Sequence, residues 1–349
     1  MGTLDDRVPV TLLTGFLGAG KTTLLNRLIS DPDVGRIAVI MNEFGDVGLD
    51  HDLIEEVTED IVLMNAGCLC CSIRGDLAKT MTLLLNRKER GELSFDRVVI
   101  ETTGIADPGP ILNTMVTDPM IAPSFRTDGI VTLADAATGP NTLDTQVEAV
   151  RQIAMADLIV LTKTDLVTSD ERERFEARLD GINGSARRLV GEHGRVLIAS
   201  LFGLSAMRKS ATPEEVSGWL GEHALHESDG HNHRIQSASI DVADPIPASV
   251  FDHWLQALMA LKGPDILRFK AIIHVEGVGM PYVFHGVQHI FERPMLLTSW
   301  SGKDTRSRIV LIARNIDKDD LKESLEKLLK QRKDHQDDAM MVDTTGTPF

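Results

Sequence analysis

Residues 15–22, GFLGAGKT, have the composition and spacing of a loop that binds phosphate groups, because they fit the pattern G-x-x-x-x-G-K-[ST]. An apolar run at 8–14 precedes the loop and a helical pattern at 21–30 follows it, which is the context that the pattern requires. Glycines allow backbone N–H groups to turn toward phosphate oxygens, and the start of a helix adds the positive end of its dipole. Lys21 would bring a cation to the phosphates and Thr22 a hydroxyl to Mg²⁺. The sequence therefore predicts a nucleoside triphosphate site.

A second strand of the same expected sheet ends in an acidic residue. The apolar run 98–100 leads directly into Glu101-Thr-Thr-Gly104. Glu101 could hold Mg²⁺ through a water molecule, and the backbone amide of Gly104 could lie near the γ-phosphate. An acidic residue after a strand is weak evidence for a Mg²⁺ ligand by itself. The evidence is stronger here because the phosphate loop is expected in the same sheet.

The sequence LTKTD at 161–165 indicates which base is bound. It follows an apolar strand, and Asp165 could accept hydrogen bonds from the ring N–H and the exocyclic amine of guanine, which adenine does not offer in that arrangement. The stem of Lys163 could cover the face of the base. The usual first residue of this motif is Asn, whereas this chain has Thr162. We therefore expect GTP over ATP, with a surface Lys-Thr-Asp turn as the alternative.

All three cysteines lie within four residues, at Cys68, Cys70 and Cys71. Secreted disulfide frameworks spread their cysteines, and adjacent Cα atoms about 3.8 Å apart are too close for an unstrained bridge. Three soft thiolates at this spacing suit zinc, cobalt or copper(I). In an extended stretch Cys71 would point away from the other two, so a fourth ligand or a turn is expected. A buried cluster without a ligand and a redox sensor remain alternatives.

The composition argues against several classes of protein. The chain has 349 residues, with 36 Lys and Arg against 52 Asp and Glu, and a formal net charge of −16. An acidic surface repels phosphate backbones, so no nucleic-acid partner is expected. No apolar run approaches the roughly 18 residues that span a bilayer, and the start, MGTLDDRVPV, lacks the features of a signal peptide. We therefore expect no membrane association and a cytoplasmic location.

The elements that must position these residues alternate along the first two hundred residues. Short apolar runs separated by helical patterns predict an α/β fold, namely a P-loop NTPase domain with a mostly parallel sheet. Its strands are expected at 8–14, 37–41, 97–101, 129–133, 158–162 and 195–200.

The pattern changes after residue 205. A polar segment rich in His follows, with a short helix expected at 214–223 and anchored by Trp219, and then a smaller α+β C-terminal domain. The strands of this domain are expected at 235–242, 269–276, 282–287 and 308–314, and its helices at 249–261 and 317–330. The expected organisation is a P-loop GTPase domain at 1–205, a polar His-containing linker at 206–233, a C-terminal domain at 234–331 and a flexible tail at 332–349.

Five motifs occur in the order expected of one family: GFLGAGKTT, NEFGDVGLD, GCLCC, ETTGIADPGP and LTKTD. In combination they resemble the P-loop metallochaperone GTPases that include CobW, the nitrile-hydratase activators and the zinc-homeostasis GTPases. ILRFKAIIHVEG and HGVQHIF in the second half are similar to the YjiA-like branch of this family, and the resemblance covers residues 7–331.

The resemblance implies a role for each matching residue. Cys68, Cys70 and Cys71 would bind the metal, together with Glu43 and Asp46 of the first switch loop, whereas Glu101 and Gly104 would belong to the second switch. Met41 stands where some relatives carry a carboxylate, which puts a metal contact from that position in doubt. The nucleotide would be bound by Gly15, Gly18, Ala19, Gly20, Lys21, Thr22, Thr23, Thr162, Lys163 and Asp165.

The resemblance also implies a function. Lys21, Thr22, Glu101 and Gly104 would catalyse hydrolysis of GTP to GDP with Mg²⁺, and a transition metal, Zn²⁺ first and Co²⁺ second, would pass to a client metalloprotein. Because Ile105-Ala-Asp follows Gly104 and no Gln does, slow intrinsic turnover is expected.

Two other functions are alternatives to this one. One is a metal sensor or buffer in which nucleotide is only a conformational ligand, and the other is a P-loop small-molecule kinase, which the guanine motif and the cysteines disfavour. The client, the metal, assembly into a homo-oligomer and metal binding by His223–His233 stay open.

Overall fold

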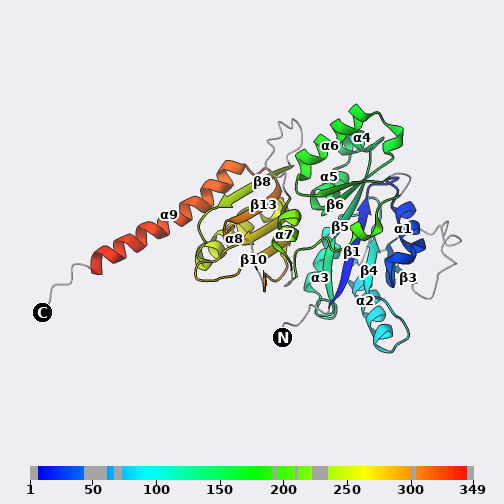
Figure 1. The fold of residues 1–349 in the computed structure, drawn as a ribbon, viewed down its shortest axis with the longest axis horizontal. Helices are drawn as coiled ribbons and strands as arrows, with labels where there is room; N and C mark the ends of the chain where they lie inside the picture. The colour runs from blue at the N-terminus through cyan, green and yellow to red at the C-terminus, as the bar shows by residue number, and fades with distance from the viewer. Residues whose placement is uncertain are drawn as a thin grey trace.

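The computed structural model describes residues 7–42, 61–66, 73–191, 195–208, 211–221, 235–298, 300 and 304–343. All structural statements below refer to these residues; for 42, 61–66, 73–76 and 333–343 they concern the backbone alone. Figure 1 shows two domains, each built on one sheet, with helix α9 (Lys318–Asp343) leading away from the second.

The first domain contains a seven-stranded sheet in the order β3-β2-β4-β1-β5-β6-β7. Every strand pair in it is parallel, so all the carboxyl ends of the strands lie at one edge. The strands are β1 (Val8–Gly15), β2 (Ile37–Asn42), β3 (Ile61–Ala66), β4 (Arg97–Glu101), β5 (Phe125–Asp135), β6 (Leu158–Thr162) and β7 (Arg187–Val190). The predicted α/β fold with a parallel sheet is confirmed.

Helices cover both faces of this sheet, because successive strand residues point to opposite sides. On β6, Ile159 and Leu161 join the core under α2, α3, α5 and α6, whereas Leu158 and Val160 join the core under α1. The helices are α1 (Lys21–Ser30), α2 (Ile73–Glu89), α3 (Gly109–Thr117), α4 (Gly139–Thr145), α5 (Val147–Met155) and α6 (Ser169–Asn183). This two-sided burial explains why the strands read as continuous apolar runs.

The second domain is an antiparallel sheet in the order β11-β10-β9-β13-β8, with β12 paired to β10. Its helices α8 and α9 pack on one face around Phe251, Trp254 and Leu325. The strands are β8 (Ile235–Val242), β9 (Ile266–Ile273), β10 (Tyr282–Val287), β11 (Ile290–Phe291), β12 (Met295–Leu296) and β13 (Ser307–Arg314), and the helices are α8 (Ala248–Lys262) and α9 (Lys318–Asp343). The predicted α+β domain is confirmed.

The segment expected to be a polar linker is packed in its described part. Helix α7 (Pro213–Leu220) buries Val216, Trp219 and Leu220 against the face of the second sheet opposite to α8. Their i, i+3, i+4 spacing gives α7 one apolar side. Trp219 is 5% exposed, as its predicted anchoring role requires. The histidines at 223–233 lie outside the described residues.

Two sequence predictions are corrected here. No strand occupies 195–200; the seventh strand is β7, and Ile198–Leu201 form a 3₁₀ turn whose apolar side chains pack on the α1 face of the sheet. β7 escaped notice because its sequence is RRLV, and its edge position leaves it only half buried. Helix α9 runs to Asp343 and not to Lys330, because 331–343 contain neither Pro nor Gly to end it.

The domains are joined by a buried charge cluster. Asp157, which follows α5, accepts hydrogen bonds from Arg268 of β9 and from the backbone of Ile130, and Lys270 Nζ lies 3.2 Å from its Oδ1. Arg268 and Lys270 are each 1% exposed. Burial alone would raise the pKa of Asp157, but the two cations lower it well below the usual range. The stabilisation from its charge is therefore present above about pH 4 and is lost as the pH falls.

Asp157→Ala is expected to lower the free energy of unfolding by roughly 3–5 kcal/mol, because it leaves the buried guanidinium of Arg268 without its counter-charge. Burial lowers the pKa of Lys270 to about 7, so this amine can lose its proton when Asp157 is removed. Urea denaturation followed by tryptophan fluorescence measures the loss of stability, since the three tryptophans are Trp219, Trp254 and Trp300. Asp96→Ala is the control: it breaks an exposed pair with Arg36 at 2.9 Å and should cost less than about 1 kcal/mol. Equal losses in the free energy of unfolding from the two changes would contradict the role of Asp157 as a buried counter-charge.

Candidate nucleotide-binding site

The loop 15–20 joins β1 to α1 in a conformation that depends on glycine. Gly15 and Gly20 have φ values of 143° and 96°, and a Cβ at Gly15 would come within 2.7 Å of the carbonyl oxygen of Leu133. Gly20 is the N-cap residue of α1, and no side chain caps this end of the helix. The N–H groups of the first turn are therefore oriented to bind an anion.

Lys21 points back into the loop. Its Nζ donates to the carbonyl oxygens of Gly15 at 2.9 Å and Phe16 at 3.3 Å, and the residue is only 9% exposed. Burial lowers the pKa of Lys21, and the nearby carboxylate of Glu101 opposes this shift. A cation thus lies inside the curve of the loop, where phosphate oxygens would meet it.

The segment after β4 lies directly against this loop. Leu13 of β1 pairs with Glu101, and the next residue, Thr102, donates its hydroxyl to that of Thr14 at 2.8 Å. A Cβ at Gly104 would come within 2.7 Å of the backbone nitrogen of Leu17. Only glycine fits this approach, so the structure brings Glu101 and Gly104 to the phosphate loop as the sequence predicted.

Residues 161–165, which are predicted to bind guanine, are hydrogen-bonded to the same loop. Thr162 donates its hydroxyl to the carbonyl oxygen of Ala19 at 2.9 Å, which joins the end of β6 to the phosphate loop. Lys163 adopts a left-handed φ of 54° and donates to Asp135 at 2.6 Å. A cavity of about 180 Å³ opens between these elements, and its lining includes Gly20, Thr23, Thr162, Lys163, Asp165 and Gly191.

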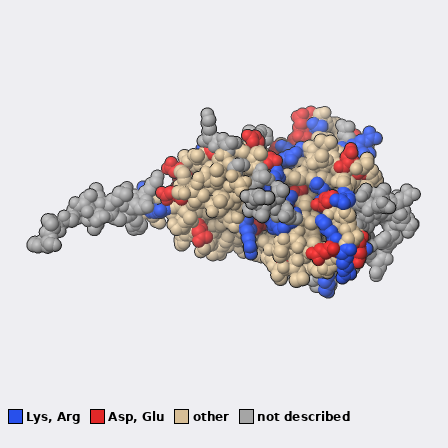
Figure 2. Space-filling model, turned by 60° about the horizontal axis from the view of Figure 1, so that its bottom comes forward, with Lys and Arg blue, Asp and Glu red and all other residues tan. Residues whose placement is uncertain are grey.

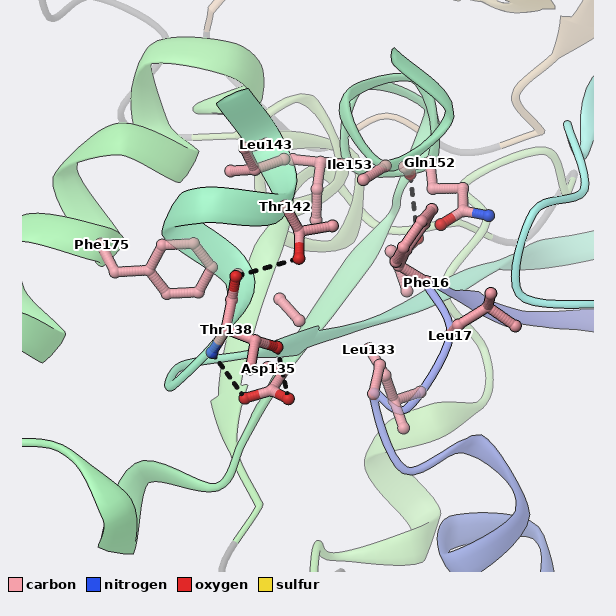
Figure 3. A pocket seen from close by; sticks show the side chains of 15 residues that line it. Phe16, Leu17, Leu133, Asp135, Thr138, Thr142, Leu143, Gln152, Ile153 and Phe175 are labelled. Atoms are coloured by element: carbon pink, nitrogen blue, oxygen red, sulfur yellow. Dashed lines mark hydrogen bonds between the residues drawn. The ribbon is translucent and has the colours of Figure 1, made fainter. Parts of the chain in front are cut away.

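Asp135, at the end of β5, is a site residue that sequence analysis missed. Burial raises the pKa of Asp135, but hydrogen bonds from Lys163, Thr138 and two backbone N–H groups outweigh it and lower the pKa. Figure 3 shows Asp135 facing Thr138 at the edge of a small, mostly apolar cavity lined also by Phe16 and Phe175. The sequence carries one indication of this role: Asp135 is an acidic residue at the end of an apolar run, as Glu101 is.

Gln152 of α5 is a second residue that no motif indicated. Its Nε2 donates to the carbonyl oxygens of Gly104 at 3.2 Å and Ala106 at 3.0 Å, and the residue is fully buried. Gln152 therefore holds the segment after β4 from the inside of the domain. A glutamine in an amphipathic helix carries no local signal for such a contact.

The oxygen atoms at this edge suit Mg²⁺. Thr22 offers a hydroxyl at the start of α1 and Glu101 a carboxylate at the end of β4, and hydroxyl, carboxylate and water oxygens are the ligands this hard cation prefers. These two residues would hold the ion beside the phosphates.

The predicted transition-metal ligands, namely Cys68, Cys70, Cys71, Glu43 and Asp46, lie outside the described residues. Within the part of the chain that is described, no group of three or more His, Cys, Asp or Glu could hold a metal ion. The cysteines follow β3, which ends at Ala66 on the edge that carries the phosphate loop, and α2 begins at Ile73.

Charges are mixed on the molecular surface. On the face in Figure 2, blue and red side chains lie beside one another over the first domain and do not form a single basic area. Among the described helices, none is long and apolar enough to cross a membrane.

Comparison with known proteins identifies the family to which the chain is similar. Residues 9–189 match the family model "CobW/HypB/UreG, nucleotide-binding domain", and residues 235–329 match "Cobalamin synthesis protein cobW C-terminal domain". The zinc chaperone YjiA of Escherichia coli is 31% identical over 93% of this chain and 99% of its own length. The zinc-regulated GTPase metalloprotein activator 1 of Schizosaccharomyces pombe is 33% identical over 89% of this chain and 83% of its own.

A solved structure agrees with these matches along nearly the whole chain. The crystal structure of the Zn(II)-bound YjiA GTPase from E. coli superposes with a TM-score of 0.71 and 28% identity, covering 92% of this chain and 99% of that one. The order of motifs, the two domains and these comparisons lead to one conclusion: the chain belongs to the CobW/HypB/UreG family, in its YjiA-like branch.

Proposed function

We propose that this protein is a GTP-hydrolysing metallochaperone that binds a transition metal, Zn²⁺ before Co²⁺, through Cys68, Cys70 and Cys71 and delivers it to a client metalloprotein. The observation that carries the proposal is the convergence of three motifs at one sheet edge. The hydroxyl of Thr162 meets the carbonyl of Ala19, and Gly104 lies against Leu17, so base motif, phosphate loop and second switch form one site.

The described residues suit the binding of GTP with its base toward β6 and its phosphates toward β1. Asp165 accepts hydrogen bonds from the guanine edge, and Lys163 is held beside the base by Asp135. Lys21 leaves the carbonyls of its own loop and meets the β- and γ-phosphates. The amide of Gly104 donates to an equatorial oxygen of the γ-phosphate. As the bond to the leaving oxygen breaks, its electron pair moves to the departing diphosphate, where Lys21 stabilises the growing negative charge.

Ile105-Ala-Asp follows Gly104, so no glutamine stands directly after it. The amide nitrogen of Gln152 donates its two hydrogen bonds to the carbonyl oxygens of Gly104 and Ala106. The attacking water therefore lacks a dedicated orienting group there. This supports slow intrinsic turnover that accelerates when a client completes the site.

Metal delivery is supported by the cysteines and by the names of the relatives, which include zinc chaperones and a zinc-regulated GTPase metalloprotein activator. Thiolates must lose their protons to bind a metal, so binding at neutral pH releases protons and strengthens as the pH rises from about 6 to 8. Glu43 and Asp46 would contribute oxygen ligands in one nucleotide state, which would couple the metal to GTP.

Changing both Cys70 and Cys71 to Ser tests the metal site, because it removes soft ligands with little change in volume. The parent protein with Co²⁺ should give a thiolate-to-metal absorption band in the near ultraviolet, and the double variant should lose it. The double variant should still bind GTP, which controls for folding. A band that is absent from the parent, or unchanged in the variant, would exclude the cysteines as ligands.

A further inference from the structure

The tip of a hairpin in the second domain contacts the second switch of the first. Gln288, in the turn between β10 and β11, donates from Nε2 to the two carboxylate oxygens of Asp107, at 3.2 and 3.4 Å. Its carboxamide also fills the space beside Gly109, where a Cβ would lie 2.7 Å from it. Gln288 has a φ of 55°, unusual for a residue other than glycine, and its own N–H donates to Leu267 at 3.1 Å. The side chain is therefore held by its turn and by the first domain together.

Asp107 lies three residues after Gly104 and fixes the end of the same segment. Its Oδ1 accepts the backbone N–H of Gly109 at 2.8 Å, and its Oδ2 lies 3.6 Å from the guanidinium of Arg151. Arg151 precedes Gln152 on α5, and Gln152 binds the carbonyls of Gly104 and Ala106. The segment 104–107 is thus held from inside by α5 and from outside by Gln288.

This contact differs in kind from the buried charge cluster around Asp157. The Asp157–Arg268 pair is almost fully buried, whereas the side chain of Asp107 is 25% exposed and pairs with a neutral amide. Separating a buried ion pair leaves charges without water or a partner, whereas a partly exposed carboxylate and amide can be hydrated when they separate. The hairpin contact can therefore open while the domains remain joined at Asp157.

We infer that Gln288 is a positioning residue for GTP hydrolysis: through Asp107 it holds Gly104 against the phosphate loop, so the C-terminal domain favours the GTP-bound arrangement of the second switch. The inference rests on the proposed GTPase function. If the hairpin contact strengthens the binding of GTP relative to GDP by some factor, then by linkage GTP must strengthen the hairpin contact, relative to GDP, by the same factor.

Gln288→Glu tests this, because it places a carboxylate against the carboxylate of Asp107. The affinity for GTP relative to GDP and the single-turnover hydrolysis rate should each fall by about five- to tenfold, the lower range of typical allosteric coupling. A side chain with only a structural role would lower the thermal unfolding midpoint and leave the GTP/GDP ratio unchanged.

Asp107→Asn should rescue the Gln288→Glu variant. In this double variant the Oδ1 of residue 107 can still accept from Gly109, while its new amide donates to the carboxylate at residue 288. The donor and acceptor have then exchanged sides, and the GTP/GDP ratio should return to within about twofold of the parent. Asp107→Asn alone gives the baseline for this comparison, because it also removes the carboxylate that faces Arg151 at 3.6 Å, and the double variant should bind and hydrolyse GTP at least as well as this single variant.

Gln256→Glu is the matched control. Gln256 on α8 donates to Asp252 at 2.8 Å, so the same change creates the same repulsion on an exposed surface of the second domain. It should leave nucleotide binding and hydrolysis unchanged. An unchanged GTP/GDP ratio in folded Gln288→Glu, or a double variant that stays impaired, would overturn the inference while parental GTP binding upheld the proposed function. A parent that does not prefer or hydrolyse GTP would overturn both.

Discussion

Lys21→Ala is expected to reduce GTP hydrolysis by about 10²- to 10³-fold, as removal of one preorganised charge or donor at a transition state commonly does. Lys21 supplies the cation inside the phosphate loop, and its Nζ lies 2.9 Å from the carbonyl oxygen of Gly15. No other basic residue occurs in the loop 15–22. Single-turnover release of phosphate measures the loss, and circular dichroism checks the fold.

Lys262→Ala is the control for this variant. Lys262 ends α8 on the exposed surface of the second domain, so the change removes the same charge without altering the loop. The control should hydrolyse GTP at the parental rate. If folded Lys21→Ala did so as well, the phosphate-binding role of residues 15–22 would be wrong.

Asp165→Ala should remove the preference for GTP over ATP. The carboxylate has no equivalent partner on adenine, so the affinity for GTP should fall by about 1–3 kcal/mol, or roughly 5- to 150-fold, while the affinity for ATP changes little. Titration of both nucleotides with Mg²⁺ present measures the two affinities.

Asp170→Ala serves as the comparison, since Asp170 is an exposed acid five residues further on, in the first turn of α6. It should keep the preference for GTP. Equal affinities of the parent protein for GTP and ATP would exclude a guanine site at residues 162–165.

Local signals explain which parts of the fold and site could be predicted. Helix α1 and strands β4 and β6 have the predicted bounds, because each is a buried apolar run or a regular helical pattern that begins at a motif. Parallel strands bring their carboxyl ends to one edge, so Lys21, Glu101 and Thr162 could be expected to meet from topology alone. The hydroxyl of Thr162 donates to the carbonyl oxygen of Ala19 and so joins the end of β6 to the phosphate loop.

The remaining site residues could not be found in this way, because their roles arise from tertiary contacts. Gln152 lies 48 residues from the carbonyl it binds, and Gln288 lies 181 residues from Asp107. Neither belongs to a repeated spacing or an apolar pattern. Asp135 does have a signal, since it ends a strand at the same edge, but the sequence predicts a role for its partner Lys163 only at the base.

The proposed coupling between nucleotide and metal predicts that the bound nucleotide changes the affinity for the metal. The affinity of the protein for Zn²⁺ should differ between the states bound to a non-hydrolysable GTP analogue and to GDP, by about five- to a hundredfold. By linkage, Zn²⁺ must change the ratio of GTP to GDP affinity by the same factor. Competition with a zinc chelator in the two nucleotide states, at fixed pH, measures this. Unequal zinc affinities with a matching shift in the nucleotide ratio are predicted; identical zinc affinities in both states would contradict delivery controlled by GTP.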